Sequence, residues 1–126
     1  SNWGHAVIYV YDELGADLIV AESNFGGDLV KANIRVHSKR APVKMVPATR
    51  GKAIRAEPVE ALYEEDLVHH VGAFPELEAE LTSWVPGETT ESPNRLDALV
   101  WMITELMLVP RVRTGGAGTI RINRGR

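Results

Sequence analysis

Residues 17–28 read Asp17-Leu-Ile-Val-Ala-Glu22 and then Ser23-Asn-Phe-Gly-Gly-Asp28. The short apolar run Leu18–Ala21 predicts a buried strand. The Gly26-Gly27 pair breaks the chain, and apolar residues then recur at helical spacing from Leu29 onward. In a sheet of parallel strands joined by helices, ligands gather at the carboxyl ends of the strands. Glu22 lies at such an end.

The alternation of strands and helices continues along the rest of the chain. Strands are predicted at residues 18–21, 43–46 and 67–71. Helices are predicted at residues 3–15, 29–36, 51–65, 76–84 and 92–109. Pro58 should kink its helix or start a new one, and Ser92 and Pro93 suit the N-cap and first position of the last helix. This order predicts an α/β fold with a mostly parallel sheet and flanking helices.

The composition is that of one globular domain. The chain has 126 residues, 44% of them apolar and 25% charged, which suffices for one core and not for two. The absence of cysteine excludes disulfides and thiolate metal sites and fits a reducing cytosol. No run approaches the roughly 20 apolar residues of a membrane span.

The charge is distributed unevenly. Residues 1–109 hold nine of the 14 basic residues and all 17 acidic ones, whereas residues 110–126 hold five arginines and no acid. An acidic body argues against broad coating of DNA, which needs a continuous basic surface. We therefore predict a domain over residues 1–109 and a basic, flexible tail over residues 110–126.

Two acidic residues occupy positions that need an explanation. Asp97 lies near the start of an apolar helix, and its neighbours on the packed side are Val100 and Trp101. The ordinary explanations are a solvated residue after a strand for Glu22 and compensation of the helix dipole for Asp97. A carboxylate placed towards the core, however, needs a cation or a hydrogen-bonded partner. If both acids converge on a divalent cation, they suit metal-dependent phosphodiester chemistry.

The residues after Glu22 favour a ligand site at this turn. Asn24, Gly26 and Gly27 follow at once, and two glycines let the backbone approach a ligand while the next helix aims its amides at it. The glycine pair also suits an ordinary tight turn. We expect Asn24 and the two glycines to shape the site.

Three basic residues follow the second strand: Arg50, Lys52 and Arg55. They could bind phosphate, as point charges or as a bidentate fork. The alternative is a solvated helix start, where positive charge is slightly unfavourable.

His69 and His70, by contrast, would point to opposite faces of the predicted third strand and could not hold one ion together. The tryptophans are expected in the core. No nucleotide-binding P-loop or zinc-binding His-Glu-x-x-His motif occurs.

The chain resembles the carboxy-terminal nuclease domain of the large terminase subunit of tailed bacteriophages and gene transfer agents. The similar segments keep their order and cover nearly the whole span from Trp3 to Leu108. They are Ile19-Val-Ala-Glu-Ser-Asn-Phe-Gly-Gly-Asp28, Thr49-Arg-Gly-Lys52, Arg55-Ala-Glu-Pro-Val59, Ala61-Leu-Tyr63, Val68-His-His-Val-Gly72 and Ser92-Pro-Asn-Arg-Leu-Asp-Ala-Leu-Val-Trp101. The arginine-rich tail is not covered.

The resemblance implies a ribonuclease H-like fold and a nuclease that cuts double-stranded DNA with two Mg²⁺ or Mn²⁺ ions held by acids. Glu22 matches the second acid of the family and Asp97 the last. The resemblance further implies cleavage of concatemeric DNA during genome packaging in the bacterial cytoplasm. The implied partners are a terminase ATPase domain, the small terminase subunit and the portal.

Two departures from the family are visible. The first metal acid of the family lies on an amino-terminal hairpin, which we expect this chain to lack, and many relatives carry an acid where this chain has Asn94. We therefore expect little or no activity from the chain alone. The strand at residues 18–21 or its neighbour should then be an exposed edge that invites a homodimer.

Two other functions stay open. One is a non-catalytic DNA-binding or assembly module derived from a terminase, with the basic tail as its working surface. The other is an unrelated small α/β enzyme with Glu22 as a general base.

Overall fold

The computed structural model of the chain describes residues 2–24 and 26–110. Its elements are α1 (Trp3–Glu13), β1 (Ile19–Glu22), α2 (Gly27–His37), β2 (Val43–Val46), α3 (Lys52–Glu64), α4 (Pro75–Ser83) and α5 (Asn94–Ile103), which continues as a π-helical turn, η1 (Thr104–Leu108). These bounds confirm the predicted helices and the first two strands. The predicted tail over residues 110–126 lies outside the described residues except for Pro110.

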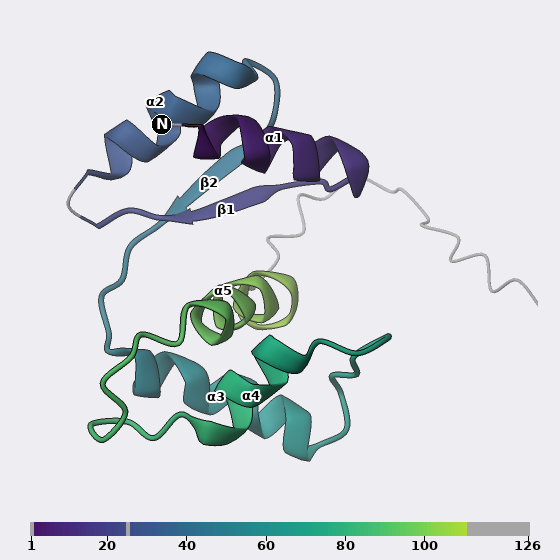
Figure 1. Ribbon diagram of the computed structural model, residues 1–126, viewed down its shortest axis with the longest axis vertical. Helices are drawn as coiled ribbons and strands as arrows, with labels where there is room; N and C mark the ends of the chain where they lie inside the picture. The colour runs from purple at the N-terminus through teal and green to yellow at the C-terminus, as the bar shows by residue number, and fades with distance from the viewer. Residues whose placement is uncertain (1, 25, 111–126) are drawn as a thin grey trace, which may run out of the picture.

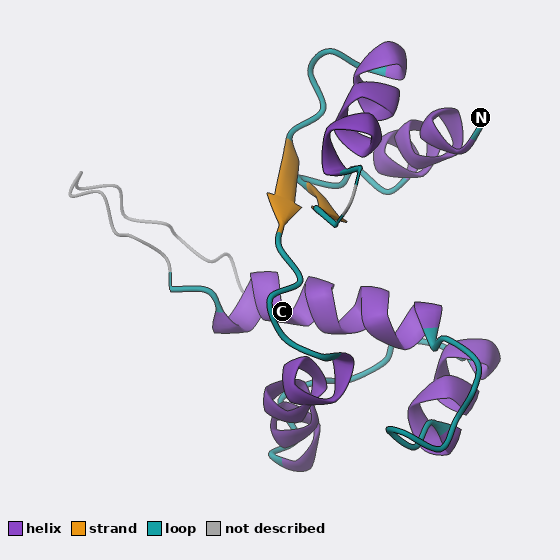
Figure 2. Cartoon of the chain, turned by 90° about the vertical axis from the view of Figure 1, so that its left-hand side faces the viewer, coloured by secondary structure: helices purple, strands orange, loops and turns teal. Residues whose placement is uncertain are grey.

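The two strands form a parallel sheet between layers of helices. Ile19 lies opposite Val43 and Glu22 opposite Val46, so the carboxyl ends of β1 and β2 meet at one edge. Helices α1 and α2 cover one face of the sheet, α5 lies on the other side, and α3 and α4 lie beyond α5 (Figure 1). Figure 2 shows the same order from the side. Within the described residues, β1 pairs with β2 alone.

The main core lies among the helices rather than around the sheet. Its buried side chains come from α3 and α5: Val59, Leu96, Leu99, Val100 and Ile103. Trp84 packs against this cluster, as expected of a core tryptophan, whereas Trp3 is 41% exposed. The prediction of a buried strand at residues 18–21 was wrong, since all four residues are only half-buried. The reason is that β1 has one unpaired edge and a cavity separates it from α5.

The third predicted strand, residues 67–71, does not form. The backbone amide of Leu67 bonds to the carbonyl of Leu62, which folds the segment back onto the end of α3. Val68 then packs against the helical core. The alternation of apolar residues here therefore reflects packing against helices and not membership of a sheet.

The helix ends depart slightly from the expected positions. Pro58 lies within one continuous helix, α3, and starts no new one. Helix α5 begins at Asn94 with Pro93 in the N-cap position, so the prediction of Ser92 as the N-cap was wrong. None of the helices in the described part of the chain is long and apolar enough to cross a membrane.

Candidate metal centre

The two singled-out acids, Glu22 and Asp97, meet at one arginine side chain. Glu22 ends β1, and Asp97 lies in the first turn of α5. Arg55 of α3 donates from Nη2 to Asp97 Oδ1 at 2.8 Å, and its Nη1 lies 3.9 Å from Glu22 Oε2. Only the first contact is a hydrogen bond, since 3.9 Å is too long for one. The fold therefore brings both acids to one guanidinium from two adjacent layers, the sheet and α5, while their binding of a shared metal ion stays a prediction.

Trp101 completes this contact, although the sequence placed it in the core. Its indole Nε1 donates to Glu22 Oε2 at 3.3 Å. The guanidinium carbon of Arg55 lies 4.6 Å from the centre of its ring, a cation–π arrangement. The sequence signal for this role was the spacing of Trp101 four residues after Asp97, which puts both side chains on one face of α5.

The turn after β1 places Asn24 beside Glu22. The Asn24 amide donates to Glu22 Oε1. Gly26 has φ +106°, a left-handed conformation that favours glycine, and precedes the first residue of α2. Gly27 packs closely, because a Cβ there would lie 3.0 Å from the Cβ of Ser23. The turn thus orients the carboxylate of Glu22, while the contribution of its glycines to ligand binding stays a prediction.

The three basic residues have different surroundings. Arg50 is exposed. Lys52 donates to Ser92 Oγ at 2.7 Å, lies 3.5 Å from Asp97 Oδ2 and keeps 34% of its side chain exposed. Arg55 is only 11% exposed and faces the acids. Contact with DNA phosphate stays a prediction for all three, and the geometry suits Arg50 and Lys52 better than Arg55.

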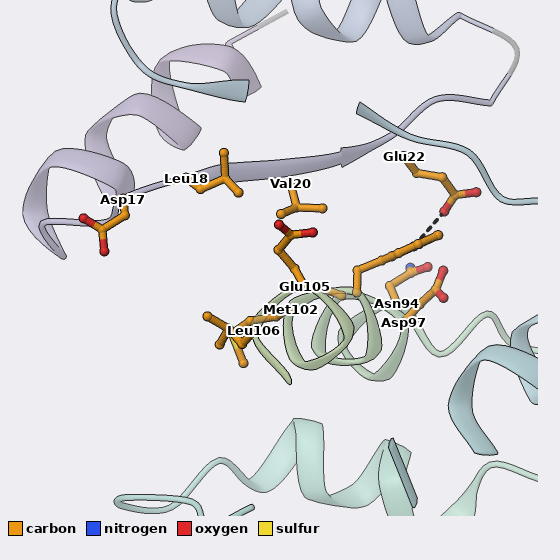
Figure 3. A pocket seen from close by; sticks show the side chains of 11 residues that line it. Asp17, Leu18, Val20, Glu22, Asn94, Asp97, Met102, Glu105 and Leu106 are labelled. Carbon is orange, nitrogen blue, oxygen red and sulfur yellow. Dashed lines mark hydrogen bonds between the residues drawn. The ribbon is translucent and has the colours of Figure 1, made fainter. Parts of the chain in front are cut away.

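A cavity of about 480 Å³ lies between β1 and α5 and reaches both acids. Figure 3 shows Glu22, Asn94 and Asp97 gathered at one end of it, with Asp17 at the other. Glu105 also lines the cavity, but it forms an ion pair of 2.6 Å with Lys44 of β2. The cavity is large enough for a hydrated ion beside the carboxylates.

Helix α4 holds the start of α5 in place. The carboxylate of Glu80 accepts from the backbone amides of Arg95 and Leu96, at 2.8 and 2.9 Å. The pKa of Glu80 lies below its ordinary value, mainly because of the hydrogen bond from the Leu96 amide. Hydrogen bonds and charge from Arg95 contribute less. Glu80 therefore supplies the helix cap that Ser92 was expected to provide. Arg95, two residues before Asp97, pairs instead with Glu80 and Glu76.

His69 and His70 have partners other than Glu22 and Asp97. Because residues 67–71 form no strand, the argument that His69 and His70 face opposite sides of one was wrong. His70 shares a hydrogen bond of 2.7 Å with the Tyr63 hydroxyl, and His69 Nε2 lies 2.8 Å from the carbonyl of Asp66. Burial raises the pKa of Tyr63 above its ordinary value. Both histidines thus have local structural partners.

The residues present fit one side of a metal site. Glu22 and Asp97 offer carboxylate oxygens, the ligands that Mg²⁺ and Mn²⁺ prefer, and they already share one cation, Arg55. Among residues 2–24 and 26–110, however, no group of three or more acidic or histidine side chains is arranged to hold a metal ion. The described residues therefore bring together two of the carboxylates that the resemblance implies as ligands, and their binding of a metal ion stays a prediction.

Comparison with known families identifies the domain. The family model named Terminase RNaseH-like domain matches residues 4–106 of this sequence. The chain belongs to this family. Searches of curated proteins and of solved structures found no match. Membership confirms the resemblance drawn from the sequence and the ribonuclease H-like α/β class, with the sheet of the described residues limited to two parallel strands. It also supports a role as a terminase module, with partners among DNA and terminase components in general.

Proposed function

We propose that this terminase domain is a nuclease module that hydrolyses double-stranded DNA with Mg²⁺ or Mn²⁺ held by Glu22 and Asp97. The observation that carries the proposal is the approach of both acids, from β1 and α5, to the single guanidinium of Arg55. Two carboxylates that share a cation in a domain of this family are suited to share a divalent ion.

The surrounding residues support this chemistry. A bound metal ion would activate water and neutralise the charge that develops on the phosphate. Asn24 and Trp101 each donate to the carboxylate of Glu22 and so fix its orientation. Lys52 lies beside Asp97 and is partly exposed, and Arg50, two residues earlier in the chain, is exposed, so both can bind the phosphate backbone of the substrate.

Membership of the family suggests a biological setting for this activity. We infer that the domain acts on concatemeric DNA during packaging, together with a terminase ATPase domain, the small subunit and the portal. Two acidic ligands leave several coordination positions of the ion open, so a further acid from outside the described residues is needed for strong binding. We therefore expect weak metal binding and little or no cleavage by the chain alone.

Metal binding at this site can be tested without any measurement of activity. The chain has three tryptophans, and the indole N–H of Trp101 lies against Glu22. Titration with paramagnetic Mn²⁺ should broaden the Trp101 indole signal in ¹H–¹⁵N spectra before those of Trp3 and Trp84. The double substitution Glu22→Gln with Asp97→Asn should abolish this preference, whereas Glu105→Gln in the same cavity should keep it. Equal broadening of all three indoles would refute the metal site.

Cleavage of plasmid DNA tests the second half of the proposal. We expect only slow nicking by the chain in Mn²⁺, lost on Asp97→Ala. Robust Mn²⁺-dependent cutting that Asp97→Ala abolishes would support the nuclease assignment and overturn the expectation of weak activity. Cutting that Asp97→Ala leaves unchanged would refute the assigned site.

A non-catalytic DNA-binding or assembly module is the second candidate. The observation in its favour is that basic side chains already occupy the oxygens of Asp97, Arg55 at Oδ1 and Lys52 near Oδ2. Salt-dependent DNA binding that survives Glu22→Gln with Asp97→Asn and disappears on removal of residues 110–126 would favour it. A homodimer through the free edge of β1 also stays a prediction, and a monomeric mass in light scattering would contradict it.

A further inference from the structure

The guanidinium of Arg55 contacts both carboxylates of the proposed metal site. Its Nη2 bonds to Asp97 Oδ1 at 2.8 Å, and its Nη1 lies 3.9 Å from Glu22 Oε2, which also accepts from the Trp101 indole. The carboxylate-bearing side chains are 16% and 26% exposed. Without a positive charge between them, two such partly buried carboxylates would repel each other.

Arg55 is held in this position by the ring of Trp101 together with its hydrogen bond to Asp97. The guanidinium stacks on Trp101, the same ring whose N–H donates to Glu22. Among the described residues, the Nε and Nη1 groups of Arg55 are buried and have no hydrogen-bond partner. A buried arginine side chain with a purely structural role normally donates hydrogen bonds to several acceptors. Arg55 therefore neutralises the acids while its own hydrogen bonding stays incomplete.

We propose that Arg55 is an internal counter-cation that competes with the metal ion for Glu22 and Asp97, so that metal binding requires displacement of its guanidinium. This inference rests on the proposed metal site. An arginine stays protonated throughout the physiological pH range, so a competing cation and not deprotonation must remove it. The cavity beside α5 reaches the same two carboxylates and gives an ion its route of access.

The opposite role for Arg55 makes the opposite prediction. If its only function were to position the acids, its loss would disorder them and weaken metal binding. If it competes with the metal, its loss leaves two unneutralised carboxylates and strengthens binding. The substitution Arg55→Met separates these cases, since methionine keeps an apolar contact with the Trp101 ring and removes the charge.

The experiment measures the Mn²⁺ concentration that half-broadens the Trp101 indole signal in the full chain. We expect Arg55→Met to lower this concentration on the order of tenfold. Arg55→Lys, which keeps a positive charge, should stay near the unsubstituted chain. Arg35→Met is the matched control, because in the described part of the chain Arg35 donates to the carbonyls of Lys39 and Ala41, just after α2, and contacts neither Glu22 nor Asp97. Unchanged or weaker binding by Arg55→Met would overturn the inference.

A second measurement needs no substitution and covers the case in which Arg55→Met fails to fold. The buried Nε–H of Arg55 should give an NMR signal whose proton exchanges slowly with water. Diamagnetic Mg²⁺ should shift this signal towards the chemical shift and the exchange rate of the exposed arginines. A signal unaffected by saturating Mg²⁺ refutes displacement. If Mn²⁺ broadens no indole selectively in any variant, the metal site itself fails. If Mn²⁺ broadens the Trp101 signal selectively and with equal affinity in the unsubstituted chain, Arg55→Met and Arg55→Lys, the metal site stands and only the role of Arg55 fails.

Discussion

Helices α1 and α2 cross so closely at Gly4 that a single methyl group should disturb the layer behind the sheet. Gly4 is buried. A Cβ built there would overlap the side-chain oxygen of Asn33 and lie 2.9 Å from His37 Cδ2 and 3.0 Å from the backbone oxygen of Asn33. The Asn33 side chain can rotate away, but its backbone oxygen moves only if α2 moves.

The expected size of the effect follows from two opposing contributions. Alanine is the better helix former, by up to about 1 kcal/mol. Overpacking of a close contact costs about 1–3 kcal/mol, because the neighbouring backbone has to shift. We expect the substitution Gly4→Ala to lower the free energy of unfolding by roughly 1–2 kcal/mol. Helix propensity alone predicts the opposite sign, so the measurement distinguishes the local argument from the tertiary one.

Urea denaturation followed by far-ultraviolet circular dichroism measures this difference. The matched control is Gly51→Ala, because Gly51 has φ −61° and a Cβ there would meet no atom within 4 Å. We expect the control to stay within about 0.5 kcal/mol of the unsubstituted chain. A Gly4→Ala variant as stable as that chain, or more stable, would show that α1 and α2 do not pack as described.

Two further predictions concern the helices that carry the site. Val59→Ala in the buried core of α3 should cost roughly 2–3 kcal/mol of unfolding free energy, whereas Val36→Ala, at an exposed position of α2, should cost less than about 0.5 kcal/mol; equal costs in urea denaturation would contradict the core assignment. Because the pKa of Glu80 is lowered in the folded state, its cap is fully effective above its ordinary pKa and is lost as the pH falls through the lowered value. Thermal unfolding measured from pH 7 downward should therefore show a smaller loss of stability for Glu80→Gln than for the unsubstituted chain, and identical acid profiles would refute the cap.

Local patterns in the sequence were sufficient to predict the helices and the first two strands, and they drew attention to the two acids that meet at Arg55. Apolar periodicity and glycine positions depend on neighbouring residues alone, so they placed α2 and α5 within a few residues. These patterns gave a wrong prediction at residues 67–71, where the sequence alternates as in a strand but the segment packs against helices. Periodicity reports which side of a segment is buried and not what covers it.

Only the tertiary structure decided which partners the acids have. Glu22 and Trp101 are 79 residues apart in the sequence, and Arg55 and Asp97 are 42 apart. No local rule links such positions, because the packing of α3 and α5 under the sheet sets their distance. The sequence therefore identified two acids that need a cation, and the fold placed Arg55 beside them because the α3–α5 core brings that guanidinium to the end of β1.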